Sequence, residues 1–303
     1  SPARNRILLL GVLVGLAVPG VVFLMILFLD TRVHSRKDLK GAVSIPFLGE
    51  IPQDKKTAKT NVAADQEDSM LSESFRILRT NMTFMAKKDK PMQVITFTSF
   101  NEGVGKTFIS RNLAMSLMLT RKRVVLVDLD IRKGTLSRHF RKHPVGVTNY
   151  LADDSIALDD IIHTDEKSGG LDIISSGTVA PNPAELLMDG RLDTLIDELR
   201  KRYDYIIVDN VPVGIVADAT ISNRISDLTI FVARAGKLDR RQLPDTEELY
   251  REGKLRNMSL ILNGVDPKRR GYGYGYGYGY GYGYGYGKHN RKKIKGQETN
   301  LPG

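Results

Sequence analysis

The fold of this 303-residue chain is decided by one stretch, which reads Val94-Ile-Thr-Phe-Thr-Ser-Phe-Asn-Glu-Gly-Val-Gly-Lys-Thr107. A short apolar, strand-like run passes directly into a glycine-rich turn, and the residues that follow have helical spacing. Backbone N–H groups of such a turn, together with the N-terminus of the next helix, form a nest for phosphate oxygens. The stretch therefore predicts a nucleotide-binding P-loop.

Two side chains of this turn have expected roles. Lys106 is expected to reach the β- and γ-phosphates, and the hydroxyl of Thr107 to bind Mg²⁺. The standard pattern G-x-x-x-x-G-K-[ST] would need glycine where this chain has Phe100, so the match is to a deviant form of the loop. For this segment alone, an ordinary glycine-rich turn is the alternative. The residues expected to contact the nucleotide are Asn101, Glu102, Gly103, Val104, Gly105, Lys106, Thr107 and Phe108.

Two further segments end apolar strands with carboxylates. Val124–Asp128 is followed by a second acid at Asp130, and Tyr205–Asp209 ends in the same way. Because the carboxyl ends of strands converge on the ligand crevice of a doubly wound sheet, these acids are expected to surround the same phosphates. An aspartate at one strand end could equally be a loop cap, but three such segments in this order favour a site. They suit Mg²⁺ coordination and proton transfer from a hydroxyl, and should be ionised there.

Short apolar runs alternate with helical stretches between about residues 71 and 266. This alternation predicts an α/β fold with a doubly wound, mostly parallel sheet of the P-loop NTPase type. Strands are expected at 94–98, 124–128, 171–174, 205–209, 228–233 and 259–262. Helices are expected at 71–86, 107–120 and 184–202.

The N-terminal part carries an uncharged run of 23 residues, 7–29, long enough to cross a hydrocarbon core of about 30 Å. A cleaved signal peptide is the alternative, but its apolar stretch is shorter and no small-residue cleavage site follows here. Basic residues are denser after the run, which predicts that the C-terminal side is cytoplasmic. We expect a transmembrane helix with a basic flank over 1–40 and a linker over 41–70.

The C-terminal part, 267–303, contains a strict Gly-Tyr alternation over 271–287 and then a basic end. Glycine at every second position costs too much backbone entropy for a stable strand, so we expect a disordered, accessible tail after a domain spanning 71–266. An adhesive, self-associating segment is the alternative. The tail tyrosines are Tyr272, Tyr274, Tyr276, Tyr278, Tyr280, Tyr282, Tyr284 and Tyr286.

The net charge of +10 lies at the two ends of the chain. Residues 1–40 contribute 6 − 2 = +4 and residues 266–303 contribute 8 − 2 = +6, so residues 41–265 are formally neutral. A neutral domain argues against nucleic acid as a partner. The absence of cysteine excludes disulfides and thiolate metal sites.

Together these segments resemble the bacterial tyrosine kinases (BY-kinases) of the Wzc type, polysaccharide co-polymerases of capsular and exopolysaccharide systems. The match includes Walker A at 99–107, the acidic Walker A′ motif at 125–130 and Walker B at 206–209. The stretches 128–134 and 181–187 are also similar to the family, and the resemblance covers nearly the whole chain. Family members often carry another membrane span and a periplasmic domain upstream, and this chain starts at Ser1, so we expect a piece of a longer protein.

The resemblance implies γ-phosphoryl transfer from Mg·ATP to tail tyrosines of an adjacent subunit in a ring, with an octamer as one possible size. Either Asp128 or Asp130 could assist the phenol. The active centre implied comprises Lys106, Thr107, Asp128, Asp130 and Asp209, with Thr107, Asp128 and Asp209 as the metal set.

The same resemblance implies a place in the bacterial inner membrane, with the kinase domain and tail in the cytoplasm. The implied partners are membrane lipid, further copies of the chain, the polysaccharide polymerisation and export machinery, and a protein-tyrosine phosphatase. Glu73, Arg76 and Arg79 match the family's oligomerisation motif and would share one helix face, because neighbours three apart do so. A solvated face with intrahelical pairs is the alternative.

A switch ATPase of the partitioning and cell-division-positioning kind is the nearest rival within the fold. That group has a lysine five residues before the P-loop lysine, where this chain has Asn101. Neither the apolar N-terminal run nor the tyrosine tail is expected of it. A non-enzymatic ATPase anchor for an adhesive tail is the second rival.

Overall fold

The computed structural model describes residues 2–53, 69–86, 91–140, 143–214 and 218–267. The predicted tail after residue 267, with all eight tyrosines, and half of the predicted linker lie outside these residues. The described residues belong to one compact unit. The account below concerns this unit.

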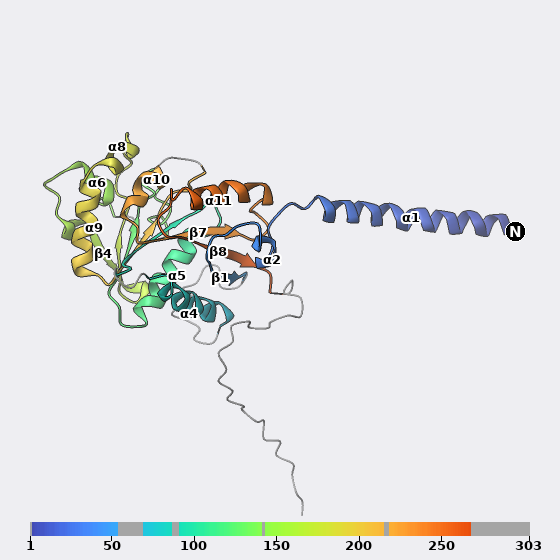
Figure 1. Cartoon of the computed structure of the whole chain (residues 1–303), viewed down its shortest axis with the longest axis horizontal. Helices are drawn as coiled ribbons and strands as arrows, with labels where there is room; N and C mark the ends of the chain where they lie inside the picture. The colour runs from blue at the N-terminus through green and yellow to red at the C-terminus, as the bar shows by residue number, and fades with distance from the viewer. Residues whose placement is uncertain (1, 54–68, 87–90, 141–142, 215–217, 268–303) are drawn as a thin grey trace, which may run out of the picture. The chain divides into compact units, whose positions relative to one another are not determined.

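Within the described residues, the strands form one eight-stranded sheet in the order β1-β8-β7-β2-β6-β3-β5-β4 (Figure 1). All neighbouring strands are parallel except the pair β4 and β5. The strands are β1 (Phe47–Pro52), β2 (Val94–Thr98), β3 (Val124–Asp128), β4 (Ile162–Asp165), β5 (Leu171–Ile174), β6 (Tyr205–Asp209), β7 (Leu228–Arg234) and β8 (Met258–Val265). The predicted mostly parallel α/β fold is confirmed.

Helices cover both faces of the sheet (Figure 1). The longer ones are α4 (Met70–Thr83), α5 (Lys106–Met118), α9 (Arg191–Arg202) and α11 (Leu243–Arg251). The shorter ones are α2 (Arg36–Leu39), α6 (Val147–Ala152), α7 (Leu158–Ile161), α8 (Pro183–Met188) and α10 (Asp218–Ser222). Helices α4 and α5 contribute to one apolar cluster and α9 to another, as a doubly wound sheet requires.

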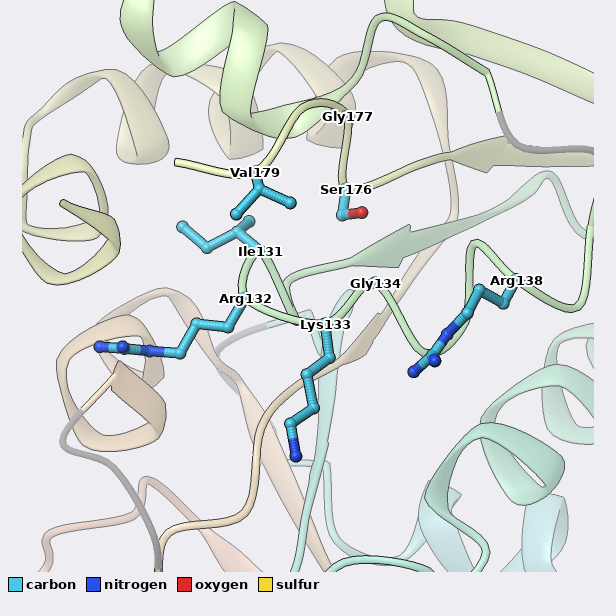
Figure 2. Close-up of a pocket in the computed structure, with 8 residues that line it drawn as sticks. All are labelled: Ile131, Arg132, Lys133, Gly134, Arg138, Ser176, Gly177 and Val179. Carbon is cyan, nitrogen blue, oxygen red and sulfur yellow. The ribbon is translucent and has the colours of Figure 1, made fainter. Parts of the chain in front are cut away.

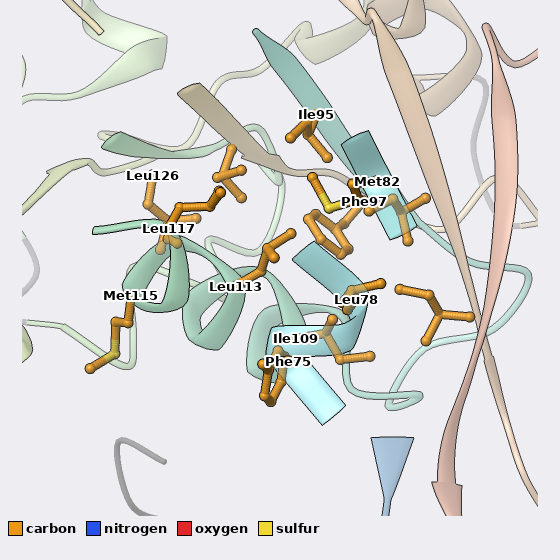
Figure 3. Packing of buried hydrophobic residues seen from close by; sticks show 14 of the residues in the cluster. Phe75, Leu78, Met82, Ile95, Phe97, Ile109, Leu113, Met115, Leu117 and Leu126 are labelled. Carbon is orange, nitrogen blue, oxygen red and sulfur yellow. The ribbon is translucent and has the colours of Figure 1, made fainter. Parts of the chain in front are cut away.

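The first cluster contains the apolar residues that recur at helical spacing along α4. Phe75, Leu78 and Met82 recur on one face of α4 and are buried beside Ile109 and Leu113 of α5 (Figure 3). Successive strand residues point to opposite faces, so Ile95 belongs to this cluster while Val94 belongs to the opposite one. The sheet is therefore buried on both sides, which fixes the positions of its strand ends.

The structure differs from the predicted linker over 41–70 at strand β1, which pairs in parallel with β8 at the edge of the sheet. Pro46 and Pro52 favoured a loop, but proline is tolerated at an edge strand because its missing N–H need not join the ladder. The preceding residues also belong to the folded unit, since Val33, Leu39 and Ile45 are buried. The fold thus begins well before residue 71.

The helix predicted over 184–202 is divided into α8 and α9. Asp189 has an extended backbone (ψ 145°), and its carboxylate accepts a 2.9 Å hydrogen bond from the N–H of Arg191. This hydrogen bond offers the backbone an alternative to helix continuation, as aspartate commonly does.

Residues 7–29 lie within one long helix, α1 (Pro2–Leu29). Among the described residues, no helix combines the length and apolar character that crossing a membrane requires. The predicted transmembrane span is therefore not confirmed.

Candidate functional site

The predicted P-loop connects β2 to α5, and two of its glycines have left-handed backbones. Gly103 has φ +66° and Gly105 has φ +97°, a region that side chains other than glycine rarely adopt. A Cβ at Gly105 would lie 2.3 Å from Nδ2 of Asn263. Asn263, at the end of β8, donates a 2.7 Å hydrogen bond to the carbonyl oxygen of Val104. A side chain at position 105 would therefore displace the amide of Asn263, and the left-handed backbone also favours glycine there.

Lys106 begins helix α5 and remains close to the loop that precedes it. Its Nζ donates to Oγ of Ser99 at 3.4 Å, and Ser99 Oγ donates to the carbonyl oxygen of Asn101 at 2.7 Å. Burial lowers the pKa of Lys106, and the carboxylates of Asp209 and Asp130 oppose that shift. The loop thus holds a desolvated cation where phosphates are expected.

Thr107 and Asp209 meet across the ends of α5 and β6. The Thr107 hydroxyl donates a 2.5 Å hydrogen bond to Oδ2 of Asp209. Oδ1 of Asp209 is buried and has no hydrogen-bond partner among the described residues. Burial raises the pKa of Asp209 to about 6. A buried carboxylate oxygen without a donor fits a cation ligand.

Asp128 lies beside Asp209 because the two residues are register partners on neighbouring strands. Its Oδ2 accepts hydrogen bonds from the backbone N–H (2.8 Å) and the hydroxyl (2.6 Å) of Ser137. Burial, and then the charge of Asp209, raise the pKa of Asp128 to about 7. At pH 7 without a cation Asp209 is therefore mostly ionised, whereas Asp128 is only partly ionised; a bound cation would lower both pKa values.

Asp130 follows the same strand and is fixed by its own loop. Its Oδ1 accepts from the N–H of Lys133 at 3.0 Å, and its Oδ2 from the hydroxyl of Thr135 at 2.7 Å. Its side chain retains slight exposure, whereas Asp128 is fully buried. The strands thus bring Asp128, Asp130 and Asp209 to the carboxyl-terminal end of the sheet, where the P-loop also lies.

The predicted set of Thr107, Asp128 and Asp209 contains two carboxylates and a hydroxyl. Among the residues that the structure describes, no group of three or more His, Cys, Asp or Glu side chains forms a metal cluster. Mg²⁺ commonly binds through only one or two carboxylates, with waters and substrate phosphates as its other ligands. The set therefore fits Mg²⁺ held jointly with a nucleotide.

Three of the residues expected to bind the nucleotide have side chains that contact other protein groups in the structure. Glu102 accepts a 2.5 Å hydrogen bond from Nζ of Lys133. Asn101 Nδ2 donates to Gln242 at 3.3 Å. The ring of Phe108 packs edge-on against Phe75, with centroids 6.1 Å apart, so its side chain contacts the core.

The sequence interpretation missed a layer of residues that supports the P-loop from β7 and β8. Lys237 Nζ and Arg234 Nη1 both donate to the carbonyl oxygen of Gly103, at 3.3 and 3.4 Å. Asn263 was missed although it directly follows the predicted strand 259–262, where strand ends converge on the site. No sequence signal identifies Lys237, which lies in the loop after β7.

Glu73, Arg76 and Arg79, which were predicted to share one face of α4, contact different partners in the structure. Arg76 pairs with Glu73 at 2.5 Å, and both are about half exposed. Arg79 instead donates to the carbonyl oxygen of Ser116 on α5 at 2.6 Å. In the described structure Arg79 therefore joins α4 to α5 of the same chain.

The sequence is similar to a family model and to several bacterial tyrosine-protein kinases. A family model described as an AAA domain matches residues 92–234. The chain is 34% identical over 204 residues to tyrosine-protein kinase YwqD of Bacillus subtilis, covering 67% of this chain and 85% of that protein. It is 31% identical to a putative tyrosine-protein kinase of the Klebsiella pneumoniae cps region, covering 88% of this chain and only 39% of that protein.

Solved structures give the same picture. The kinase domain of the Escherichia coli tyrosine kinase ETK is similar with a TM-score of 0.71 at 28% identity, covering 84% of this chain and all of that one. The BceF tyrosine kinase domain is similar with a TM-score of 0.68 at 33% identity, covering 77% of this chain and 99% of that one.

Proposed function

This chain belongs to the bacterial tyrosine-protein kinases, and from that membership we propose that it phosphorylates its own C-terminal tyrosines with ATP. The observation that carries the proposal is the junction of Thr107 and Asp209, because an unpartnered, buried Oδ1 lies beside a threonine hydroxyl at the P-loop. The acceptor would be one of the eight tyrosines between 272 and 286.

In the proposed reaction, the phenol oxygen of a tail tyrosine attacks the γ-phosphorus of ATP while the bond to the β,γ-bridging oxygen breaks, and ADP leaves. Backbone N–H groups of the P-loop and Lys106 would hold the phosphates and stabilise the charge that moves onto ADP. Thr107, Asp209 and Asp128 would hold Mg²⁺, which supplies electrostatic stabilisation of the phosphate oxygens.

The proton of the phenol must pass to a base, because a phenol has a pKa of about 10. Asp128 and Asp130 are the two carboxylates available in the second acidic motif. We favour Asp130, since its side chain retains slight exposure whereas Asp128 is fully buried. Asp130→Asn should then lower kcat more than it weakens Mg·ATP binding, whereas Asp128→Asn should weaken both.

The direct test incubates the full chain with Mg·ATP and maps phosphotyrosine along residues 271–287 by mass spectrometry. Wild type should gain phosphate on the tail and Lys106→Met should not. Equal absence of phosphotyrosine in both folded proteins would refute kinase activity.

Transfer between subunits is part of the proposal, and a mixing experiment tests it. Lys106→Met has acceptor tyrosines and no activity, while a variant with all eight tail tyrosines changed to Phe has activity and no acceptors. Their mixture should label the Lys106→Met chain. Absence of label would indicate transfer within one chain.

Assembly into a ring, with tail phosphorylation loosening it, is proposed on electrostatic grounds. Each phosphate adds about −1.5 to −2 charges, so full phosphorylation would outweigh the +6 charge of residues 266–303. Phosphorylated tails on neighbouring subunits would then repel one another. Stoichiometric phosphorylation should reduce the oligomer mass in solution, and an unchanged mass would refute this step.

The cellular setting is proposed from the same relatives. The Klebsiella relative is named for the cps region, and we propose that this chain regulates capsular or exopolysaccharide polymerisation and export, with a phosphatase resetting the tail. Exposed apolar side chains on α1, among them Leu16 and Phe23, support attachment to the inner membrane, because such a surface is unfavourable in water. Deleting a chromosomal copy should reduce surface polysaccharide, and Lys106→Met should fail to restore it.

A further inference from the structure

A small basic cavity lies beside the candidate active centre, and the proposed reaction gives it no role. Its volume is about 60 Å³, which is enough for several water molecules. Arg132, Lys133 and Arg138 are on its lining, together with Ser176, and the residues that line it include no acid (Figure 2).

The cavity forms where the loops after β3 and β5 approach each other. Gly134 has φ +56°, and a Cβ there would lie 2.5 Å from Oγ of Ser176. Figure 2 shows Ser176 and Val179 from one loop facing Ile131 and Gly134 of the other. Glycine at 134 therefore allows the two loops to build the cavity wall.

Two hydrogen bonds connect the cavity to the active centre. Arg138 Nη2 donates to Oγ1 of Thr135 at 3.4 Å, and the Thr135 hydroxyl donates to Oδ2 of Asp130 at 2.7 Å. A ligand in the cavity would thus lie close to the carboxylate that we favour as proton acceptor.

The cavity cations can accept an anion without breaking the fold. Arg132 is held by the buried carboxylate of Asp218 at 2.5 and 3.1 Å, but a guanidinium has five N–H donors and can share them. Lys133 pairs with Glu102, and both are about half exposed. Such a surface pair contributes little free energy, so Lys133 is free to exchange partners.

An aryl phosphate matches this cavity. The lining holds three cations and no acid, a set of side chains that suits a phosphate dianion. The apolar side chains of Ile131 and Val179 also line the cavity and offer contact to an aromatic ring. Phosphotyrosine combines these two chemistries.

We propose that the cavity binds a phosphotyrosine in the tail of a second copy, so that one phosphorylated tyrosine positions another at the active centre. This inference rests on the proposed kinase function. In an extended peptide every second residue faces the same side, at a spacing of about 6.6 Å, and the tail has tyrosine at every second position from 272 to 286. Each phosphorylation would then promote the next.

The test compares two tail peptides as substrates of the full chain whose eight tail tyrosines are Phe. Both peptides keep the Gly-Tyr register with a single acceptor tyrosine; one carries phosphotyrosine two or four residues away, and the other carries Phe there. The ratio of kcat/KM for the phosphorylated over the unphosphorylated peptide should be about tenfold, the effect of one charge-assisted contact. A ratio of one would overturn the proposal.

Variants of Arg138 test whether the preference for the phosphorylated peptide depends on the cavity. Arg138→Ala should reduce the ratio to about one and Arg138→Lys should restore part of it, whereas Arg123→Ala, at the opposite end of β3, should leave it unchanged. An unchanged ratio in Arg138→Ala would overturn the assignment of the site. If neither peptide is phosphorylated by the active chain, the proposed function fails instead.

Direct binding distinguishes the ligand chemistry. The phosphorylated peptide should bind the Lys106→Met chain about tenfold more tightly than the Phe peptide, and phenyl phosphate should displace it. Equal affinity for the two peptides would overturn the proposal. Equally effective displacement by inorganic phosphate would overturn the assignment to an aryl phosphate.

Discussion

The side-chain amide of Asn263 donates a 2.7 Å hydrogen bond to the carbonyl oxygen of Val104. Through this contact the end of β8 supports the P-loop, although the two residues are far apart in the sequence. A Cβ at the adjacent Gly105 would meet the same amide at 2.3 Å. Nucleotide binding should therefore depend on β8 as well as on the loop itself.

Gly105→Ala should weaken ATP binding by more than about tenfold and lower the midpoint of urea unfolding, because it adds a clash to backbone strain of about 1–3 kcal/mol. Gly253→Ala is the matched control, since Gly253 has φ +64° with nothing within 4 Å of a Cβ. It should lower stability and leave ATP affinity unchanged. Equal ATP affinity in both variants would contradict the close approach of Asn263.

Two truncations should distinguish the role of helix α1 from the role of the segment 30–40 that follows it. Val33 accepts a hydrogen bond from the N–H of Gly236 and donates one to the carbonyl oxygen of Leu238, each 2.8 Å long, and Lys237 between them supports Gly103. If α1 attaches the chain to the membrane, as proposed, removal of residues 1–29 should release the protein from the membrane fraction with ATP affinity retained. Removal of 1–40 should also weaken ATP binding several-fold, measured with a fluorescent analogue. Equal ATP affinity in the two truncated chains would show that the segment does not support the loop.

Asp209→Asn should abolish tail phosphorylation and still stabilise the chain without nucleotide. The folded pKa is about 6 against an ordinary 3.8, so the fold loses stability as pH rises through this interval, and the loss is complete above it. The variant should gain about 3 kcal/mol at pH 8 and almost nothing below pH 4. Urea unfolding at the two pH values checks this, with Asp197→Asn as an exposed control; a gain equal at both pH values would contradict the burial effect.

Asp227→Ala should destabilise the domain by about 3 kcal/mol at pH 7. Burial opposes ionisation of Asp227, but hydrogen bonds from Arg200 and from the N–H groups of Val94 and Gln93 outweigh it and hold the pKa below 3.8. The stabilisation is therefore complete above about pH 4 and is lost as pH falls through the lowered folded pKa. The difference from wild type should shrink in acid, and a constant difference down to pH 2 would contradict this mechanism.

Arg79→Ala and Arg76→Ala should have different effects. Arg79 donates to the carbonyl oxygen and hydroxyl of Ser116 at 2.6 and 3.3 Å, so its loss should cost about 1.5 kcal/mol of unfolding free energy. Arg76 has a half-exposed partner, Glu73, and its loss should cost less than about 1 kcal/mol. If α4 forms the subunit interface, Arg76→Ala should reduce oligomer mass without loss of stability. An Arg79→Ala variant with unchanged stability would contradict the intrachain contact.

Strands buried on both faces were predictable, because continuous apolar runs distinguish them. The expected bounds at Val94–Thr98, Val124–Asp128 and Tyr205–Asp209 agree with the structure, and with them the grouping of the three aspartates. β1 and β4 lie at the sheet edges and lack such a run. Their positions depend on pairing with β8 and β5, which local sequence does not specify.

At the site, the P-loop glycines and acids have a recognisable order, whereas their supports do not. Lys237 and Asn263 act through contacts between segments distant in sequence. The separation of Arg79 from Arg76 has the same origin, since side chains on one helix face can turn to different neighbours. Such contacts follow from tertiary packing and require coordinates.

The contact between β8 and the P-loop also determines when the nucleotide site can be completed during synthesis. A chain emerging from the ribosome makes its P-loop before β8, because strand Met258–Val265 follows more than one hundred residues later. Until β8 has joined the sheet, the loop lacks the support of Asn263, and early elements cannot complete a nucleotide site alone. The proposed acceptor tyrosines are translated soon after that strand, so under the proposed function the enzyme would be completed shortly before its substrate is made.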